Sequence, residues 1–446
     1  MNGEKIRLLK QAVRFVADNL SPTDRLSVIP FANAAWRLTP LRSMTSAGKS
    51  DTFRAINSLR ANGGTNIISG LKLAVQVLEQ RREKNPVSSI ILLSDGHDNQ
   101  NGNGSNFVDS LCDLPPCLRA NDSQTDTVPV YTFGFGTDHD AAALHAVADG
   151  SGGTFSYIES IEVIQDAFAR CIGGLLSVVS QEVEIDLKTV SDGVQIQSIS
   201  SGRYRNKIDS DKLHGMIYVG EVYAEEEKKF LAYLSITPVY MQTKTTQLLK
   251  VKCRYKDPLS NHNQYIMSDI VSLQIRRPLH EDLTEEEKKV NLEVDRERNR
   301  VSITEGISEA QAMAERGDLW MARAMLQQRR KTLMQSASAL AGDEFCQRLE
   351  SEVNEIHERM SSMPEYEAGG RAYTFSRQSS HTTQRASTQA ITPQMMPQVR
   401  PHTAPVGAME FQTSNMTMLV FKSQEMLNIG NRDDKAGASS SKSTKR

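Results

Sequence analysis

The sequence predicts a multi-domain protein in which an α/β region is followed by an all-β region, an α-helical region and a disordered tail. Three observations predict this order. Short apolar runs alternate with helix-period segments up to residue 180, the apolar period becomes two from 181 to 277, and charged helical patterns follow Pro278. At 446 residues the chain is too long for one compact core. We therefore expect domains at 1–178, 181–277 and 281–362, and a tail at 363–446.

The α/β region is predicted from apolar periodicity and from turn residues between the periodic segments. Helices are expected at 6–19, 50–59, 67–84, 141–148 and 161–180. Strands are expected at 25–31, 36–41, 87–94, 128–136 and 154–158. Residues 99–127 are rich in Asn, Gly, Asp and Ser, which indicates a long surface insertion with one helical turn near 107–111. Alternating helices and strands predict a parallel sheet covered on both faces.

Residues 181–277 alternate apolar and polar side chains and contain turns at 191–193 and 257–258. This pattern predicts an antiparallel β-sandwich of six to eight strands. After Pro278, a Thr284-Glu285-Glu286-Glu287 capping box predicts a long helix ending near Arg316, followed by helices at 318–334 and 343–360. We interpret these as a small helical bundle rather than an array of tetratricopeptide-style repeats, since such repeats need neighbours to bury their faces.

From about Pro364 the chain is rich in Ser, Thr, Gln, Pro and Met and shows little periodicity, which predicts disorder. One apolar island interrupts this tail, at residues 416–421. It is interpreted either as a docking peptide or strand that joins a partner sheet, or as unspecific apolar character.

The composition argues against several classes of partner. A formal net charge of −2 gives no field that favours nucleic acid, and no apolar run approaches the ~18 residues of a membrane span. The first residues, Met1-Asn2-Gly3-Glu4-Lys5, have no apolar segment of a secretory signal. Five scattered cysteines fit free thiols in a reducing compartment, although Cys112 and Cys117 could also bridge or share a metal. We expect a cytoplasmic or nuclear protein that is not secreted.

The chemistry is expected where the strand at 87–94 ends. Asp95 follows this strand directly, at the carboxyl edge where open α/β sheets bind ligands, and Thr65 lies in the glycine loop Asn62-Gly63-Gly64-Thr65-Asn66. A carboxylate and a hydroxyl are hard oxygen ligands suited to Mg²⁺. Each residue alone could instead cap a helix N-terminus.

Residues 1–175 resemble a von Willebrand factor type A (vWA) domain. The resemblance is carried by Lys5–Phe31, Gly63-Gly64-Thr65-Asn66, Leu93-Ser94-Asp95-Gly96 and Phe133-Gly134-Phe135-Gly136. It implies a Rossmann-like fold and a metal-ion-dependent adhesion site in which Thr65 and Asp95 are metal ligands. It also implies that the metal takes a carboxylate from a protein partner, so that the domain binds rather than catalyses.

The resemblance also implies that part of the site is missing. The family's first metal loop runs Asp-x-Ser-x-Ser-Met-x-Gly-x-Lys, and Met1-Asn2-Gly3-Glu4-Lys5 matches only its last five positions. The first strand and the Asp-x-Ser-x-Ser ligands would precede Met1. Either the chain is a truncated product, or another segment or chain fills the slot. Mg²⁺ binding is therefore expected to be weak, and the sheet is expected to have unpaired edges.

Residues 1 to about 362 also resemble the carboxyl-terminal part of plant RING-type E3 ubiquitin ligases of the wavy-growth group. The sandwich and the stretch Tyr223–Leu231 carry this resemblance, with the sandwich taken as the vWA-associated Vwaint segment. No set of eight Cys/His RING ligands is present in the sequence.

The sequence thus predicts a non-enzymatic interaction scaffold with a degenerate adhesion site. The alternative is a fragment or substrate-recruiting regulator of a RING-type ligase. A third hypothesis, a hydrolase, would use Asp95 with the loop residues His97, Asp98, Asp138, His139 and His145, although no Gly-x-Ser-x-Gly elbow accompanies them. The loop Gly134-Phe135-Gly136 lacks the third glycine of a dinucleotide fingerprint and is expected to be a strand-to-helix turn.

Overall fold

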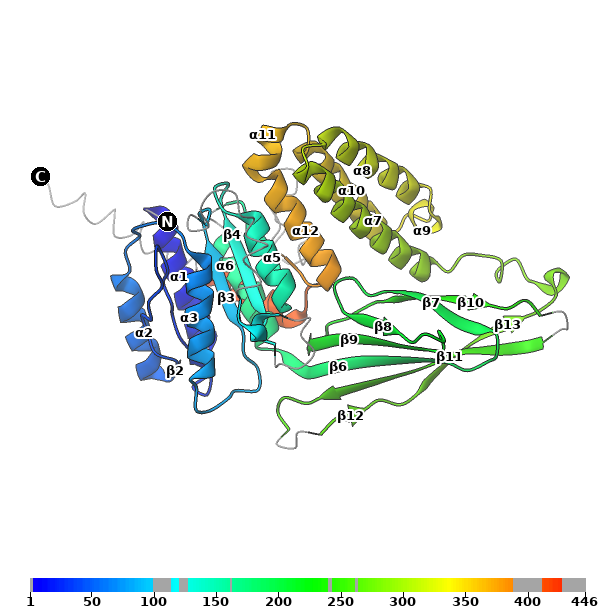
Figure 1. Cartoon of the computed structure of the whole chain (residues 1–446), viewed down its shortest axis with the longest axis horizontal. Coiled ribbons are helices and arrows are strands. Elements are labelled where there is room, and N and C mark those ends of the chain that lie inside the picture. Colours follow the sequence, from blue (N-terminus) through cyan, green and yellow to red (C-terminus); the bar gives the residue numbers. More distant parts are fainter. Residues whose placement is uncertain are drawn as a thin grey trace, which may run out of the picture. The chain divides into compact units, whose positions relative to one another are not determined.

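The computed structural model describes residues 3–98, 114–119, 127–160, 163–239, 243–260, 264–387 and 411–426 (Figure 1). The chain divides into two compact units. Unit 1 comprises Met1–Ser177 and Ala386–Arg446, and unit 2 comprises Val178–Arg385.

Unit 1 is an α/β domain whose largest described sheet is parallel. Its helices are α1 (Glu4–Asn19), α2 (Ser46–Ser58), α3 (Ile67–Glu79), α5 (Ala141–Ser151) and α6 (Ile164–Leu175), with a short 3₁₀ turn η2 (Pro116–Leu118). Its strands are β1 (Arg25–Leu26), β2 (Arg42–Ser43), β3 (Ile90–Ser94), β4 (Val130–Phe135) and β5 (Phe155–Ile158). The sheet has the order β3-β4-β5, and β1 pairs with β2 in a separate antiparallel ribbon. The predicted α/β class of this region is confirmed.

The two faces of β4 explain the layers of unit 1. Tyr131, Phe133 and Phe135 are on one face, where they join a core with α1 and α6. On the other face the Thr132 hydroxyl donates to the Leu144 carbonyl of α5 at 2.9 Å. Successive side chains of a strand point to opposite faces. Because both faces of β4 are covered, every residue of this strand is buried.

Several predicted elements have different limits. The strand expected at 25–31 forms a ladder only at Arg25–Leu26, and the one expected at 36–41 is replaced by Arg42–Ser43. Residues 27–31 are joined to the segment that follows them by separate hydrogen bonds and not by a continuous ladder. For example, the Leu38 N–H donates to the Val28 carbonyl at 3.0 Å. The helix expected at 67–84 ends at Glu79. Most of the insertion expected at 99–127, including its helical turn and Cys112, lies outside the described residues.

Unit 2 begins with the antiparallel β-structure that the alternating pattern predicts. Its strands are β6 (Val178–Thr189), β7 (Val194–Ser200), β8 (Asn206–Ile208), β9 (His214–Tyr223), β10 (Leu231–Ile236), β11 (Thr243–Lys256), β12 (Ile266–Met267) and β13 (Val271–Arg277). One sheet has the order β12-β11-β6-β9-β8, with β13 also paired to β11, and the second pairs β10 with β7. Leu187, Ile196 and Ile217 are at the centre of the core between them.

The helices of unit 2 follow the sandwich. They are η4 (His280–Asp282), α7 (Leu292–Glu315), α8 (Leu319–Met334), α9 (Ala337–Leu340), α10 (Glu344–Arg359), α11 (Met363–Glu365), the π-helical turn η5 (Tyr366–Gly370) and α12 (Arg371–Thr383). The predicted capping box is present, because the Glu287 N–H donates to Thr284 Oγ1 at 3.2 Å and the Thr284 N–H to Glu287 Oε2 at 3.0 Å. It closes only a turn, however, and the long helix starts later, capped by Asn291.

The prediction of a disordered tail over 363–446 is wrong for 363–387 and 411–426. In α12 the polar side chains that suggested disorder are buried and hydrogen-bonded: Thr374 Oγ1 donates to the Gly370 carbonyl at 2.8 Å, and Arg377 and His381 both contact Glu352. Residues 414–426 form a further helix, helix 414–426. The apolar island at 416–421 is part of it, so within this chain it is neither a strand nor an unstructured docking peptide.

Candidate metal and partner-binding site

Asp95 lies where the sequence placed it, directly after β3. The preceding Ser94 closes a tight turn, since its hydroxyl lies 3.4 Å from the Gly96 N–H and 3.2 Å from the Gly96 carbonyl. The Asp95 side chain is 16% exposed. Asp95 thus lies at the carboxyl edge of the sheet, and its side chain is partly enclosed but still accessible to solvent.

Thr65 is brought against the same turn by the glycine loop before α3. Asn66, not Thr65, caps α3, because its side chain accepts from the Ser69 N–H at 2.8 Å. The Thr65 hydroxyl instead packs against Gly96, where a Cβ would meet Thr65 Oγ1 at 2.7 Å. The structure thus brings the Thr65 and Asp95 loops together, and only a glycine at position 96 allows this approach.

A third side chain from α1 completes the neighbourhood. Lys5 Nζ lies 3.7 Å from Asp95 Oδ2 and 5.2 Å from the centre of the Phe135 ring. The positive charge of the Lys5 ammonium offsets the negative charge of the Asp95 carboxylate, which a metal cation would need as a ligand. The sequence gives no signal of this contact, because it depends on where the fold places the Lys5 side chain.

The described residues do not fit a complete metal site. Mg²⁺ requires six ligands in near-octahedral geometry, whereas one carboxylate and one hydroxyl are present beside an ammonium. No three His, Cys, Asp or Glu side chains of the described segments group closely enough to hold a metal. The role of Thr65 and Asp95 as metal ligands remains a prediction.

Two of the histidines considered for a hydrolytic centre, His139 and His145, pack against aromatic rings of unit 1. His139 is 4% exposed, and its ring packs over Gly134 and 5.6 Å from the Tyr157 ring. Burial lowers the pKa of His139 to about 4 despite its Nδ1 contact to the Gly136 carbonyl at 2.7 Å. His145 packs edge-on against Phe155. These contacts place both rings in the packing around β4 and β5.

The Gly134-Phe135-Gly136 loop has the geometry of a strand-to-helix turn. Gly136 has a φ of +72°, and Asp140 caps α5 by accepting from the Ala143 N–H at 2.9 Å. The structure thus accounts for both glycines without a nucleotide.

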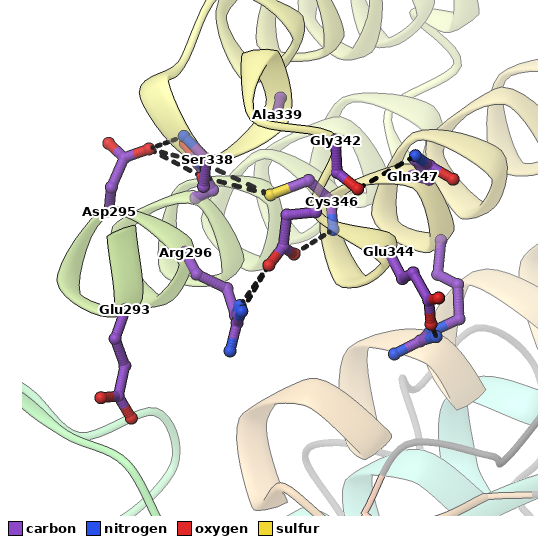
Figure 2. A network of polar contacts seen from close by, with 12 residues as sticks. Glu293, Asp295, Arg296, Ser338, Ala339, Gly342, Glu344, Cys346 and Gln347 are labelled. Carbon is purple, nitrogen blue, oxygen red and sulfur yellow. Dashed lines mark hydrogen bonds and ion pairs between the residues drawn. The ribbon is translucent and has the colours of Figure 1, made fainter. Parts of the chain in front are cut away.

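A second polar cluster, which the sequence did not reveal, joins α7, α9 and α10 (Figure 2). Asp295 Oδ2 accepts from the Ser338 N–H at 2.8 Å and from its hydroxyl at 2.7 Å. Cys346 Sγ lies 3.3 Å from the same hydroxyl, and burial raises the pKa of this thiol. A buried thiol with a raised pKa is a poor nucleophile, so the cluster holds helices together rather than reacting.

Comparisons with known proteins agree with the fold of unit 1. Residues 1–170 match the von Willebrand factor type A domain, and residues 343–425 match the "VWA / Hh protein intein-like" (Vwaint) family. The chain therefore contains both regions. The Vwaint match corrects the sequence analysis, because it covers helical residues and not the β-sandwich at 181–277.

The relatives include plant ubiquitin ligases. The chain is 30% identical over 371 residues to the E3 ubiquitin-protein ligase WAV3 of Arabidopsis thaliana, which is 82% of this chain and 45% of the relative. It is 28% identical over 360 residues to the probable E3 ubiquitin-protein ligase WAVH2 of the same plant, covering 79% and 45%. The chain thus spans a little under half the length of these relatives.

One solved structure shares the fold over most of the chain. A von Willebrand factor type A protein from Catenulispora acidiphila has a TM-score of 0.60 at 17% identity, covering 79% of this chain and 78% of that one. In the described part of this chain, no helix has the length and apolar character to cross a membrane.

Proposed function

We propose that the chain is a non-enzymatic protein-interaction scaffold whose vWA domain carries a degenerate adhesion site at Thr65 and Asp95. The observation that carries this proposal is the packing of the Thr65 hydroxyl against Gly96, which joins the two loops at the sheet edge. In this proposal an acidic side chain of the partner approaches the edge, assisted by a weakly held Mg²⁺ or by Lys5. The protein acts in the cytoplasm or nucleus.

A second function is favoured by the similarity to WAV3 and WAVH2. The chain would recruit substrates for a RING-type E3 ubiquitin ligase. Because the chain spans under half of these relatives, their transfer activity is not assigned to it.

Affinity capture from plant cell extract tests the first function. The bait is the full chain, compared with Thr65→Ala, Asp95→Ala and, as a matched control, Glu79→Ala on the exposed end of α3. We expect the same captured proteins for the chain and the control and their loss with both site variants. An unchanged set with Asp95→Ala would remove the site from the proposal.

Reconstituted ubiquitination tests the enzyme question separately. With activating and conjugating enzymes, ubiquitin and this chain as sole ligase, we expect no conjugates. Fusing the chain to a RING domain should then direct ubiquitin to the captured proteins. Conjugates formed by the unfused chain would overturn the non-enzymatic assignment.

A further inference from the structure

The antiparallel β-structure of unit 2 has an open edge at β13. This strand pairs with β11 on one side, and no strand of the described residues pairs with its other side. An unpaired edge presents a row of backbone N–H and C=O groups, which is a template for a further strand. Proteins usually protect such an edge with proline, lysine or an inward-pointing charge, but residues 271–275 contain none of these. This edge therefore has the properties of an interface.

The inner face of β13 is exposed as well. Leu273 lies opposite Leu249 of β11, so the two side chains lie on the same face of the sheet. Val271 lies on this face too, because side chains two residues apart in a strand point the same way. Leu249 belongs to the sandwich core and is 4% exposed, whereas Val271 is 59% and Leu273 is 47% exposed. Other large apolar side chains exposed along this edge are Tyr265, Ile266, Met267 and Ile270. A partner at this edge would bury apolar surface that is exposed in the single chain.

The sequence of this edge is complementary to itself in one antiparallel register. With Leu273 opposite Leu273 of the partner subunit, Val271 lies opposite the partner's Ile275. Asp269, two residues before β13, then lies opposite the partner's Arg277. Two-fold symmetry makes the contacts away from the axis occur twice. Moving the axis by one residue in either direction places an apolar side chain opposite Arg277 or opposite Asp269. The register centred on Leu273 is therefore the one that pairs apolar with apolar residues and acid with base.

We propose that β13 is the interface of a two-fold symmetric dimer of this chain, in which the two copies join their sheets edge to edge. The occupant is a second copy because both the apolar and the charged residues of this edge match the same edge reversed. A guanidinium has five N–H donors, so the bond of Arg277 Nη2 to the Thr237 carbonyl at 2.8 Å leaves donors for Asp269 of the partner subunit. Such a dimer does not depend on the adhesion site, and it would present that site twice to one multivalent partner.

Sedimentation velocity of the full chain at roughly 1 to 100 µM tests for the dimer. We expect a reversible monomer–dimer equilibrium with a dissociation constant on the order of 10 µM, because a strand-edge contact is a small interface. Hydrogen exchange on the unmodified chain then locates the contact. Amides of residues 271–277 should exchange more slowly at the higher concentration, because pairing gives the outward N–H groups an acceptor.

Charge exchange tests the register. Asp269→Arg and Arg277→Asp each turn two opposite-charge contacts into like-charge contacts, and each variant alone should dimerise about tenfold more weakly. An equimolar mixture of the two variants should dimerise about as tightly as the unmodified chain, because every contact between them again joins an arginine and an aspartate. Glu344→Arg, the same change of charge at an exposed residue of α10, should leave dimerisation unchanged. Circular dichroism checks that all three variants fold.

A chain that stays monomeric at about 100 µM would overturn the proposal, and so would association beyond a dimer, since an isologous edge contact closes with two copies. A dimer in which the exchange of β13 is unchanged would place the interface elsewhere on the chain and refute it as well. A mixture of the two charge variants that associates no better than either alone would contradict the register. Equal weakening by Glu344→Arg would show that the variants act through net charge and not through β13.

Discussion

Gly134 and His139 show how one absent side chain shapes the carboxyl end of the sheet in unit 1. A Cβ on Gly134 would lie 2.2 Å from His139 Nε2. We expect Gly134→Ala to destabilise the protein by about 1–3 kcal/mol, the usual cost of overpacking a buried site. Chemical denaturation measures this change. Gly150→Ala is the control, because no atom lies within 4 Å of its Cβ and alanine favours the helix by about 0.5–1 kcal/mol. Equal stability of both variants would show that the His139 ring moves aside freely.

Lys5 and Asp95 determine how the candidate site responds to a cation. Calorimetric titration of the chain with Mg²⁺ should give a dissociation constant of roughly a millimolar or weaker, because few ligands are present. Lys5→Met should strengthen binding by up to about fivefold, the value of a partly exposed ion pair, and Asp95→Ala should abolish it. Tight binding by the unmodified chain, lost in Asp95→Ala, would contradict the incomplete site.

At the scale of single elements, helix 414–426 closes the core of unit 1. Leu419 is 5% exposed and packs with α1 and α6, and the Ser423 hydroxyl donates to Asp166 at 2.7 Å. Leu419→Ala should lower the free energy of unfolding by about 2–3 kcal/mol. Met418→Ala, at a residue 58% exposed, should change it by less than about 0.5 kcal/mol. Thermal denaturation distinguishes the two, and equal effects would show that the helix is not held by its apolar face.

The elements that were predicted well from the sequence are those whose own apolar period shows which of their side chains are buried. The helix at 6–19 and the strands at 87–94 and 128–136 carry a clear period, so the parallel sheet followed from them. Helix 414–426 has only a short apolar stripe, and α12 is rich in Ser and Thr. Their burial depends on partners distant in sequence, such as Glu352 for His381 at 2.7 Å. Composition alone therefore predicted disorder where tertiary contacts form helices.

For the candidate site, the sequence predicted where the residues lie but not which contacts their side chains make. Strand ends and glycine loops placed Thr65 and Asp95 at one edge, because parallel strands share their carboxyl edge. Sequence could not show that Asn66 caps α3, or that Lys5 reaches Asp95, since both depend on side-chain positions.

At the scale of the whole molecule, unit 1 is built from two separate segments of the sequence. The first segment ends at Ser177. Residues Ala386–Arg446 return to unit 1, so it is assembled from both ends of the chain. A cut after Ser177 would remove helix 414–426 and expose Phe168 and Ile172, which pack in the same core. The core of unit 1 therefore depends on helix 414–426 as well as on the residues before 178.

Acid should destabilise the two units over different pH ranges. In unit 1 burial lowers the pKa of His139 from 6.5 to about 4, so the unfolded state binds the proton first. Stability is present above pH 6.5 and is lost as the pH falls toward 4, by up to about 3 kcal/mol. In unit 2 burial would raise the pKa of Glu226, but Arg385 and Lys228 outweigh it and lower the pKa from 4.5 to about 2. Glu352 shows the same shift beside His381 and Arg377. The stability that these carboxylates confer is present above pH 4.5 and is lost toward pH 2.

Hydrogen exchange with mass spectrometry between pH 7 and 3 resolves this difference, after correction for the intrinsic exchange rate. Peptides of β4 should lose protection between pH 6.5 and 4, and peptides of β9 and α10 only below about 4.5. Glu226→Gln should flatten the lower transition without moving the upper one, because sites in separate cores act independently. His139→Ala should do the reverse. A single transition shared by β4 and α10 would show that the two units unfold together, and the division of the chain would then be one of contacts but not of stability.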